Sequence, residues 1–277
     1  MEKVQLRTPF FVVNPKSYLY GEEILKLAKY TDQLAEKYDF DVLFTAQLID
    51  LPRIIDESPH LIPCAQNMES LKPGRGMGHV LPEALAAAGV KATFLNHAEN
   101  PATAHELAAT IARANELGIL TVVCADSVEE GEWIAGLEPD VMVCELTSLI
   151  GTGQVAGEDY MRGSTEAVKR VSPSTKVLQA AGISSGQNVY DAIRYGADGT
   201  GGTSGIVAAA DPFATLDEMF EALDRDALTS ARRRRRWQST RRSSRCRRSP
   251  ASPRTWTSRR ACAVPSRRPA SRRASPS

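Results

Sequence analysis

Apolar runs and amphipathic segments alternate along most of the chain. Runs of consecutive apolar residues predict strands that are buried on both faces, as in a parallel sheet. Segments with apolar residues at helical spacing among charges predict helices that cover such a sheet. The predicted strands are residues 10–14, 41–46, 61–65, 92–96, 119–125, 140–144, 176–180 and 197–202. The predicted helices are residues 21–37, 48–57, 82–88, 101–117, 127–135, 158–171, 185–195 and a last one from about 212 to 223.

Eight strand-then-helix units of this kind are typical of a closed (β/α)8 barrel, which commonly forms a single domain of about 250 residues. We assign residues 1–228 to this α/β domain. An open, doubly wound sheet is the alternative arrangement of the same elements. Against the open sheet, no Gly-x-Gly-x-x-Gly motif follows the first strand, and the spacing of the units is even.

The charges of the chain are unevenly distributed. From residue 231 to the end there are 17 Arg and no Lys, Asp or Glu, which leaves 17 basic and 33 acidic residues in the rest. Residues 229–277 have almost no apolar pattern, so we expect a disordered tail. A basic tail could bind nucleic acid through phosphate contacts. We favour another interpretation: Arg without Lys, starting abruptly after the eighth unit, resembles a GC-rich gene translated in a shifted frame.

Cysteine usage and hydropathy indicate the cellular environment in which the protein is expected to act. The five cysteines are odd in number and widely spaced, and Cys64, Cys124 and Cys144 stand in apolar runs, so we expect buried, reduced thiols. No Cys-x-x-Cys pair or His/Cys cluster supports a structural metal site. No apolar run approaches the ~18 residues of a membrane span, and the N-terminus does not resemble a secretory leader. We therefore expect a soluble cytoplasmic protein.

Polar residues with catalytic potential follow several of the predicted strands. The sixth strand ends at Glu145, which precedes a short loop closing in Gly-Thr-Gly and is our candidate for a catalytic base. Asn14 and Lys16 follow the first strand, and His97 and Glu99 follow the fourth. Taken singly, each has a structural explanation, such as a turn, a solvated charge or a helix cap. Because the carboxyl ends of barrel strands form one face, these residues together predict an active site there.

Small residues follow the last two strands. Such residues let a ligand approach backbone N–H groups, and the loops after strands seven and eight often hold phosphate in barrels. Tight turns between strand and helix would use the same glycines. The candidate residues of these loops are Gly182, Ser184, Thr203, Ser204 and Gly205.

These motifs together resemble the triosephosphate isomerase family in its shorter archaeal-type form. The resemblance runs from about residue 10 to residue 223 and implies a TIM barrel. It also implies an aldose–ketose isomerase that acts on a small phosphorylated sugar without a cofactor or a metal. The residues that carry it are Asn14-x-Lys16, the segment 94–99 (FLNHAE), Glu145 with the segment 149–153 (LIGTG), the segment 181–184 (AGIS) and Ser204-Gly205.

The resemblance also implies roles for individual residues. Glu145 would take a proton from the carbon beside the carbonyl, while a neutral His97 polarises the carbonyl oxygen as an enediolate forms, a pairing described for this family. Lys16 would add positive charge, Asn14 a hydrogen bond and Glu99 support from behind. Ile150, Gly151 and Gly153 would form the tip of a mobile lid that binds phosphate, opposite the residues of the last two loops. The substrates implied first are D-glyceraldehyde 3-phosphate and dihydroxyacetone phosphate.

The chain also departs from the family's pattern. Leu146 replaces the usual proline after the base, Pro15 replaces a large apolar residue, and Ala98 stands where serine is common. Met77 lies where a threonine of the neighbouring subunit normally supports the lysine, in a long Gly-rich loop over residues 66–79. We therefore expect a homodimer or homotetramer. A larger tetrose or pentose ketose phosphate as substrate, and a non-catalytic sugar-phosphate-binding protein, remain alternatives.

Overall fold

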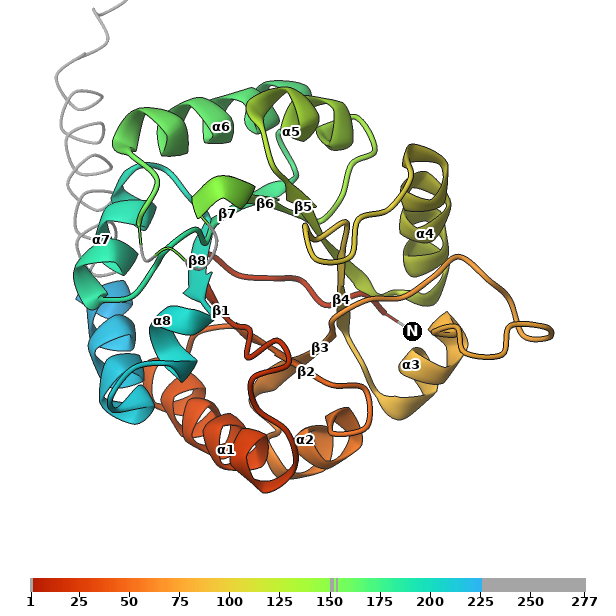
Figure 1. The fold of residues 1–277 in the computed structure, drawn as a ribbon, viewed down its shortest axis with the longest axis horizontal. Coiled ribbons are helices and arrows are strands. Elements are labelled where there is room, and N and C mark those ends of the chain that lie inside the picture. The colour runs from red at the N-terminus through yellow and green to blue at the C-terminus, as the bar shows by residue number, and fades with distance from the viewer. Residues whose placement is uncertain (1, 150–151, 153, 226–277) are drawn as a thin grey trace, which may run out of the picture. The chain divides into compact units, whose positions relative to one another are not determined.

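The computed structural model describes residues 2–149, 152 and 154–225 of the chain. Within this part, eight parallel strands close into a barrel in sequence order, and β1 pairs with β8 to complete the ring. Helices surround the ring of strands (Figure 1). The predicted (β/α)8 TIM barrel is therefore confirmed. The open sheet is excluded, because its first and last strands would not pair. The predicted tail, residues 229–277, lies outside the described residues.

The elements follow the predicted pattern closely. The strands are β1 (Phe10–Val13), β2 (Val42–Ala46), β3 (Leu61–Ala65), β4 (Ala92–Leu95), β5 (Leu120–Ala125), β6 (Val141–Cys144), β7 (Lys176–Gln179) and β8 (Gly199–Gly202). The helices are α1 (Gly21–Tyr38), α2 (Leu51–Glu57), α3 (Pro82–Ala88), α4 (Ala104–Leu117), α5 (Val128–Ala135), α6 (Glu158–Val171), α7 (Gly186–Arg194), α8 (Ser204–Val207) and a helical segment over residues 212–225. A short 3-10 turn, Thr147–Leu149, follows β6.

Apolar side chains alternate between two layers along the strands, as β1 shows. Phe10 and Val12 of β1 belong to the cluster inside the barrel, while Phe11 and Val13 pack in the layer between the strands and the helices. The period of two follows from the pleat of a strand. Burying one such side chain fully contributes about 1.5–3 kcal/mol to the free energy of folding. The two layers together therefore stabilise the barrel and fix the positions of the strand ends.

The ring closes where β8 meets β1. The residues of β8 are Gly-Thr-Gly-Gly, and a Cβ atom at Gly199 would lie 2.5 Å from the ring of Phe10. At Gly201 a Cβ atom would lie 2.2 Å from the backbone oxygen of Val12. Gly199 and Gly201 therefore make room for the bulky residues of β1 inside the barrel.

Two helices begin later than the pattern predicts. The prediction started one helix at residue 101, but α4 begins at Ala104, where Thr103 caps it by accepting a hydrogen bond from the Glu106 amide at 3.2 Å. The apolar pattern alone does not show such a cap. Likewise α2 begins at Leu51 rather than at residue 48. The four-residue helix α8 was not predicted, because it is too short to show a helical period.

The long loop between β3 and α3 is fixed at its base and exposed at its tip. At the base, the Glu69 amide donates to the Val80 carbonyl at 3.3 Å, and the His79 ring contacts the Glu69 carboxylate at 3.0 Å. At the tip, Met77 is fully exposed. A large apolar side chain in that position is a candidate contact for another chain.

The thiols of the described residues behave as the sequence predicts. Cys64, Cys124 and Cys144 are buried and unpaired, while Cys246 and Cys262 lie outside the described residues. Burial raises the pKa of the Cys144 thiol to about 12. Among the helices of the described residues, none is long and apolar enough to cross a membrane.

Candidate active site

The strand ends bring the predicted catalytic side chains to one place. Lys16 follows β1, His97 follows β4 and Glu145 follows β6, and all three line a cavity of about 30 Å3 at the carboxyl end of the barrel. Asn14 and Thr203 line the same cavity. Residues that lie up to 189 positions apart in the sequence, from Asn14 to Thr203, therefore meet because parallel strands end on one face.

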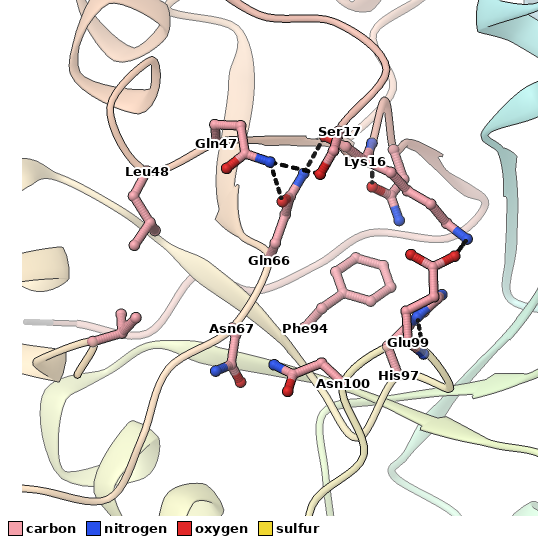
Figure 2. Close-up of a pocket in the computed structure, with 12 residues that line it drawn as sticks. Lys16, Ser17, Gln47, Leu48, Gln66, Asn67, Phe94, His97, Glu99 and Asn100 are labelled. Atoms are coloured by element: carbon pink, nitrogen blue, oxygen red, sulfur yellow. Dashed lines mark hydrogen bonds and ion pairs between the residues drawn. The ribbon is translucent and has the colours of Figure 1, made fainter. Parts of the chain in front are cut away.

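Lys16 is held by its backbone as well as by its side chain. Its φ is +49°, a left-handed conformation that is uncommon for a residue with a side chain. The Asn14 side-chain oxygen accepts from the Lys16 amide at 3.1 Å, and the Gln66 side chain donates to the Lys16 carbonyl at 2.7 Å. The Lys16 ammonium lies 2.6 Å from the Glu99 carboxylate (Figure 2). These contacts fix a positive charge beside the cavity.

His97 is held in a neutral state. The backbone amide of Glu99 donates to His97 Nδ1 at 3.1 Å, so that nitrogen carries no proton and the neutral ring has its N–H on Nε2. Burial lowers the pKa of His97, and the neighbouring Lys16 charge lowers it further. Near pH 7 the neutral ring therefore offers one hydrogen-bond donor, the N–H at Nε2.

The residue before this histidine anchors the loop. Asn96 has a φ of +55°, and its side-chain amide donates to the Cys124 carbonyl at 3.0 Å and to the Glu130 carboxylate at 3.1 Å. The Glu130 carboxylate also accepts from the Asp126 amide at 2.7 Å. The loop that presents His97 is thus tied to the start of α5.

Glu145 has a different environment. Burial of its carboxyl raises its pKa, while the Lys16 charge acts in the opposite direction. Among the residues whose side chains are described, none donates a hydrogen bond to the carboxylate. Glu145 also lines two further cavities, one of about 230 Å3 beside Ala98 and one of about 60 Å3 beside Gly182. A raised pKa and free space on several sides suit a base that moves.

The loops after β7 and β8 form the side of the site opposite to His97. With Lys16 and Glu145, they line the cavity of about 60 Å3. Ser184 is an exception, because it is exposed and its amide donates to the Asn188 side chain at 3.2 Å. Ile150, Gly151 and Gly153, the predicted lid tip, lie outside the described residues. The predicted residues that line this cavity are Gly182, Thr203, Ser204 and Gly205.

Comparison with known proteins decides the family. A family model described as "Triosephosphate isomerase" matches residues 9–219. A triosephosphate isomerase of Methanobacterium bryantii is 34% identical over 221 residues, which are 78% of this chain and 97% of the relative. The enzyme of Methanocaldococcus jannaschii is 33% identical over 215 residues (76% and 98%), and that of Methanopyrus kandleri 34% over 225 residues (79% and 100%). This chain belongs to the triosephosphate isomerase family.

Membership of the triosephosphate isomerase family makes the protein an isomerase, an intramolecular oxidoreductase. The resemblance seen in the sequence is confirmed over nearly the same residues. The departures from the family's pattern can now be placed. Ala98 lines the cavity of about 230 Å3 that Glu145 also borders, so a hydroxyl is missing there. Leu146 comes immediately after Glu145, before the 3-10 turn Thr147–Leu149.

The structure adds residues that the sequence analysis missed. A cavity of about 300 Å3 adjoins Lys16 and His97 and is lined by several amide side chains (Figure 2). Gln47 and Gln66 directly follow β2 and β3, so the rule that served for the other strand ends would have found them. Within the described part of the chain, no cluster of His, Cys, Asp or Glu could hold a metal ion. The amide side chains of this cavity are those of Asn14, Gln47, Gln66, Asn67 and Asn100.

Proposed function

We propose that this protein interconverts D-glyceraldehyde 3-phosphate and dihydroxyacetone phosphate through an enediolate, without a cofactor. The observation that carries the proposal is the meeting of Glu145, His97 and Lys16 around one cavity. Family membership and the names of the relatives support the choice of a triose phosphate as substrate. Proton abstraction beside a carbonyl needs a base together with donors aimed at the oxygen that becomes negative.

Each catalytic group has a role that follows from its environment. Glu145, with its raised pKa, takes the proton from the carbon beside the carbonyl and returns it to the neighbouring carbon. His97 donates from Nε2 to the carbonyl oxygen and stays neutral between steps. Lys16 stabilises the negative charge of the enediolate, and Asn14 donates a hydrogen bond. Glu99 holds the Lys16 ammonium in position.

The phosphate group lies between the lid and the last two loops. Gly182, Thr203, Ser204 and Gly205 border the cavity on one side. In this proposal Ser184 and the lid residues Ile150, Gly151 and Gly153 also bind the phosphate. Closure of the lid would exclude water from the enediolate, which otherwise loses phosphate. Leu146 lacks the restricted φ of a proline, so the hinge has more conformational freedom in the open state.

The protein assembles as a homodimer or homotetramer in this proposal and acts in the cytoplasm. The exposed loop tip at Met77 supports the assembly, as do Ile49 (86% exposed) and Tyr20 (73% exposed) after neighbouring strands. Apolar side chains exposed on a folded chain are favourable contacts for a second copy. Sedimentation equilibrium of the full chain measures the number of copies, and a monomer at micromolar concentration would contradict this part.

A larger ketose phosphate is the second candidate substrate. The observation that favours it is the cavity of about 300 Å3 beside Lys16 and His97, whose amide side chains could bind the hydroxyl groups of a longer sugar. The two candidates differ only in the substrate, because the proton transfer is the same for both.

A substrate panel tests the proposal. The full chain is incubated with dihydroxyacetone phosphate and with tetrulose and pentulose phosphates, and aldose formation is followed by NMR. The proposal expects the highest kcat/KM on the triose phosphate. A higher value on a longer ketose phosphate supports the second candidate instead. Binding of all of them without turnover would show a sugar-phosphate-binding protein and overturn the catalytic assignment.

A further inference from the structure

Thr45 lies beneath the catalytic loop that follows β1. We propose that Thr45 is a positioning residue, which fixes the side-chain amide of Asn14 so that its NH2 group, and not its oxygen, faces the substrate. The inference rests on the proposed isomerase function, because it assigns Asn14 the task of donating a hydrogen bond to the reacting oxygen. It adds a residue of β2, a strand that has no other part in the proposed chemistry.

Thr45 points into the barrel from the carboxyl end of β2. Leu43, two residues earlier, belongs to the cluster inside the barrel, and alternation along the strand places Thr45 on the same side. Thr45 has no solvent exposure. A buried hydroxyl needs a hydrogen-bond partner, since leaving it unpaired is costly. The partner of Thr45 is the Asn14 side-chain oxygen, which lies 2.5 Å from its Oγ1.

The orientation of the Asn14 amide follows from its neighbours. Oxygen and nitrogen of an amide side chain are hard to tell apart by shape, so the donors around them must decide. The Lys16 backbone amide can only donate, and it lies 3.1 Å from the atom assigned as Asn14 Oδ1. That atom is therefore the oxygen. Since Thr45 contacts the same oxygen, its hydroxyl must be the donor.

Two donors use both lone pairs of the Asn14 oxygen. The NH2 group of Asn14 is then the part of the amide left to face the cavities that Asn14 shares with Lys16 and His97. This orientation matters for catalysis, because a donor stabilises an oxygen that becomes negative. The reversed amide would present its own oxygen and repel that charge. The Lys16 amide requires this orientation, and the Thr45 hydroxyl, as a second donor to the same oxygen, holds the amide in it.

The same contact supports Lys16 indirectly. The Asn14 oxygen accepts from the Lys16 amide, in the residue with a φ of +49°. If the Asn14 amide rotated, the Lys16 amide would lose this acceptor and the left-handed backbone would lose one of its two anchors. The other anchor, from Gln66 to the Lys16 carbonyl, would remain. We therefore expect the larger effect on turnover and a smaller one on substrate binding.

Removal of the Thr45 hydroxyl is the decisive change. Thr45→Val keeps the shape of the side chain, and Thr45→Ser keeps the hydroxyl. Loss of one hydrogen bond of this kind corresponds to about a tenfold change in rate, so Thr45→Val is expected to lower kcat about tenfold with KM changed less than about threefold. Thr45→Ser is expected to restore kcat to within about threefold of the unaltered chain. In an Asn14→Ala background, Thr45→Val is expected to have no further effect.

A matched control separates positioning from simple loss of a buried hydroxyl. Thr200 is also fully buried in a strand, and its hydroxyl donates to the Gln179 carbonyl at 2.8 Å without contacting Asn14. Thr200→Val is expected to lower the melting temperature but to leave kcat within about twofold. An equal loss of kcat in Thr200→Val, or an unreduced effect of Thr45→Val in the Asn14→Ala background, would overturn the inference.

A second readout does not depend on activity. The side-chain amide of Asn14 is expected to be rigid in 15N relaxation measurements on the unaltered chain and mobile on the nanosecond scale in Thr45→Val. An equally rigid amide in Thr45→Val would overturn the inference whatever the kinetics show. An unaltered chain that isomerises nothing in the substrate panel would instead overturn the proposed function, and the relaxation measurement would still decide the role of Thr45.

Discussion

The loops after β1 and β4 and the loop after β6 border the same cavity, but they are held in different ways. Lys16 has hydrogen bonds at its amide, its carbonyl and its side chain. His97 accepts from the Glu99 amide. Glu145 has no donor to its carboxylate among the side chains that are described, and open space borders it toward Ala98, toward Gly182 and toward His97.

In the proposed mechanism, this difference corresponds to two tasks. Groups that stabilise a developing charge work best when they are already in place, since no energy is then lost to reorganisation during the reaction. A base carried at the root of a lid must instead change position as the lid closes. One side of the site is therefore fixed in advance, and the other is left free. Changes on the fixed side should act mainly on kcat, and changes near the free side mainly on lid closure.

The largest expected effect on the fixed side comes from His97. His97→Gln keeps a polar side chain but changes the donor geometry, and loss of one such donor lowers kcat by about 10²- to 10³-fold. KM should change little, because the hydrogen bond strengthens as the enediolate forms. Steady-state kinetics on dihydroxyacetone phosphate measure both constants. His105→Gln is the control, since His105 is exposed on α4. A drop in kcat below about threefold in His97→Gln would contradict the assignment.

The link between the two sides is the effect of Lys16 on Glu145. Burial raises the pKa of Glu145 and the Lys16 charge opposes that rise, so Lys16→Met should raise the pKa further. The base works only when deprotonated. The acid limb of the kcat/KM profile should therefore lie above the ordinary pH range of a glutamate, and should move to still higher pH in Lys16→Met. His97 gives no such limb near neutral pH, because its pKa is lowered. An acid limb that moves to lower pH in Lys16→Met would contradict the claim that Lys16 lowers the pKa of Glu145.

The smallest of these effects concerns the free side. Gly182 has a φ of +72°, and a Cβ atom there would lie 2.0 Å from the backbone oxygen of Gln154, which follows the proposed lid in the sequence. Gly182→Ala should push the Gln154 backbone away and raise KM about tenfold or more, with a smaller change in kcat. A clash that costs ~1.4 kcal/mol already corresponds to a tenfold loss of binding. Gly163→Ala in α6 is the matched control, because nothing lies within 4 Å of its added Cβ. Equal kinetics for the two variants would refute the close contact between Gly182 and Gln154.

Much of this molecule could be predicted because its signals are local. Strands buried on both faces appear as apolar runs, and the strand ends then identify Lys16, His97 and Glu145 without knowledge of the helices. Helix starts were less accurate where a cap such as Thr103 decides them. Ser127 and Glu130 have the spacing of a capping box, but only Ser127 caps α5, because the Glu130 carboxylate binds the Asn96 side chain and the Asp126 amide.

The supporting contacts could not be predicted, because they join residues far apart in the chain. Thr45 is 31 positions from Asn14, and Gln66 is 50 positions from Lys16. Nothing in the sequence near Thr45 distinguishes it from a threonine that simply fills a strand. Its role depends on the register of β1 against β2, in which Val13 lies beside Phe44. Only a structure shows which neighbouring side chains that register brings together.

The most direct test of the central claim is proton exchange at the carbon beside the carbonyl. Dihydroxyacetone phosphate is incubated in D2O with the unaltered chain or with Glu145→Gln, and deuterium uptake is followed by NMR, while binding of inorganic phosphate is measured separately. Since a positioned base contributes about 10²- to 10⁴-fold, exchange should fall by that factor in Glu145→Gln with phosphate affinity unchanged. Unchanged exchange in Glu145→Gln would contradict the account, because the proton would then be removed by another group.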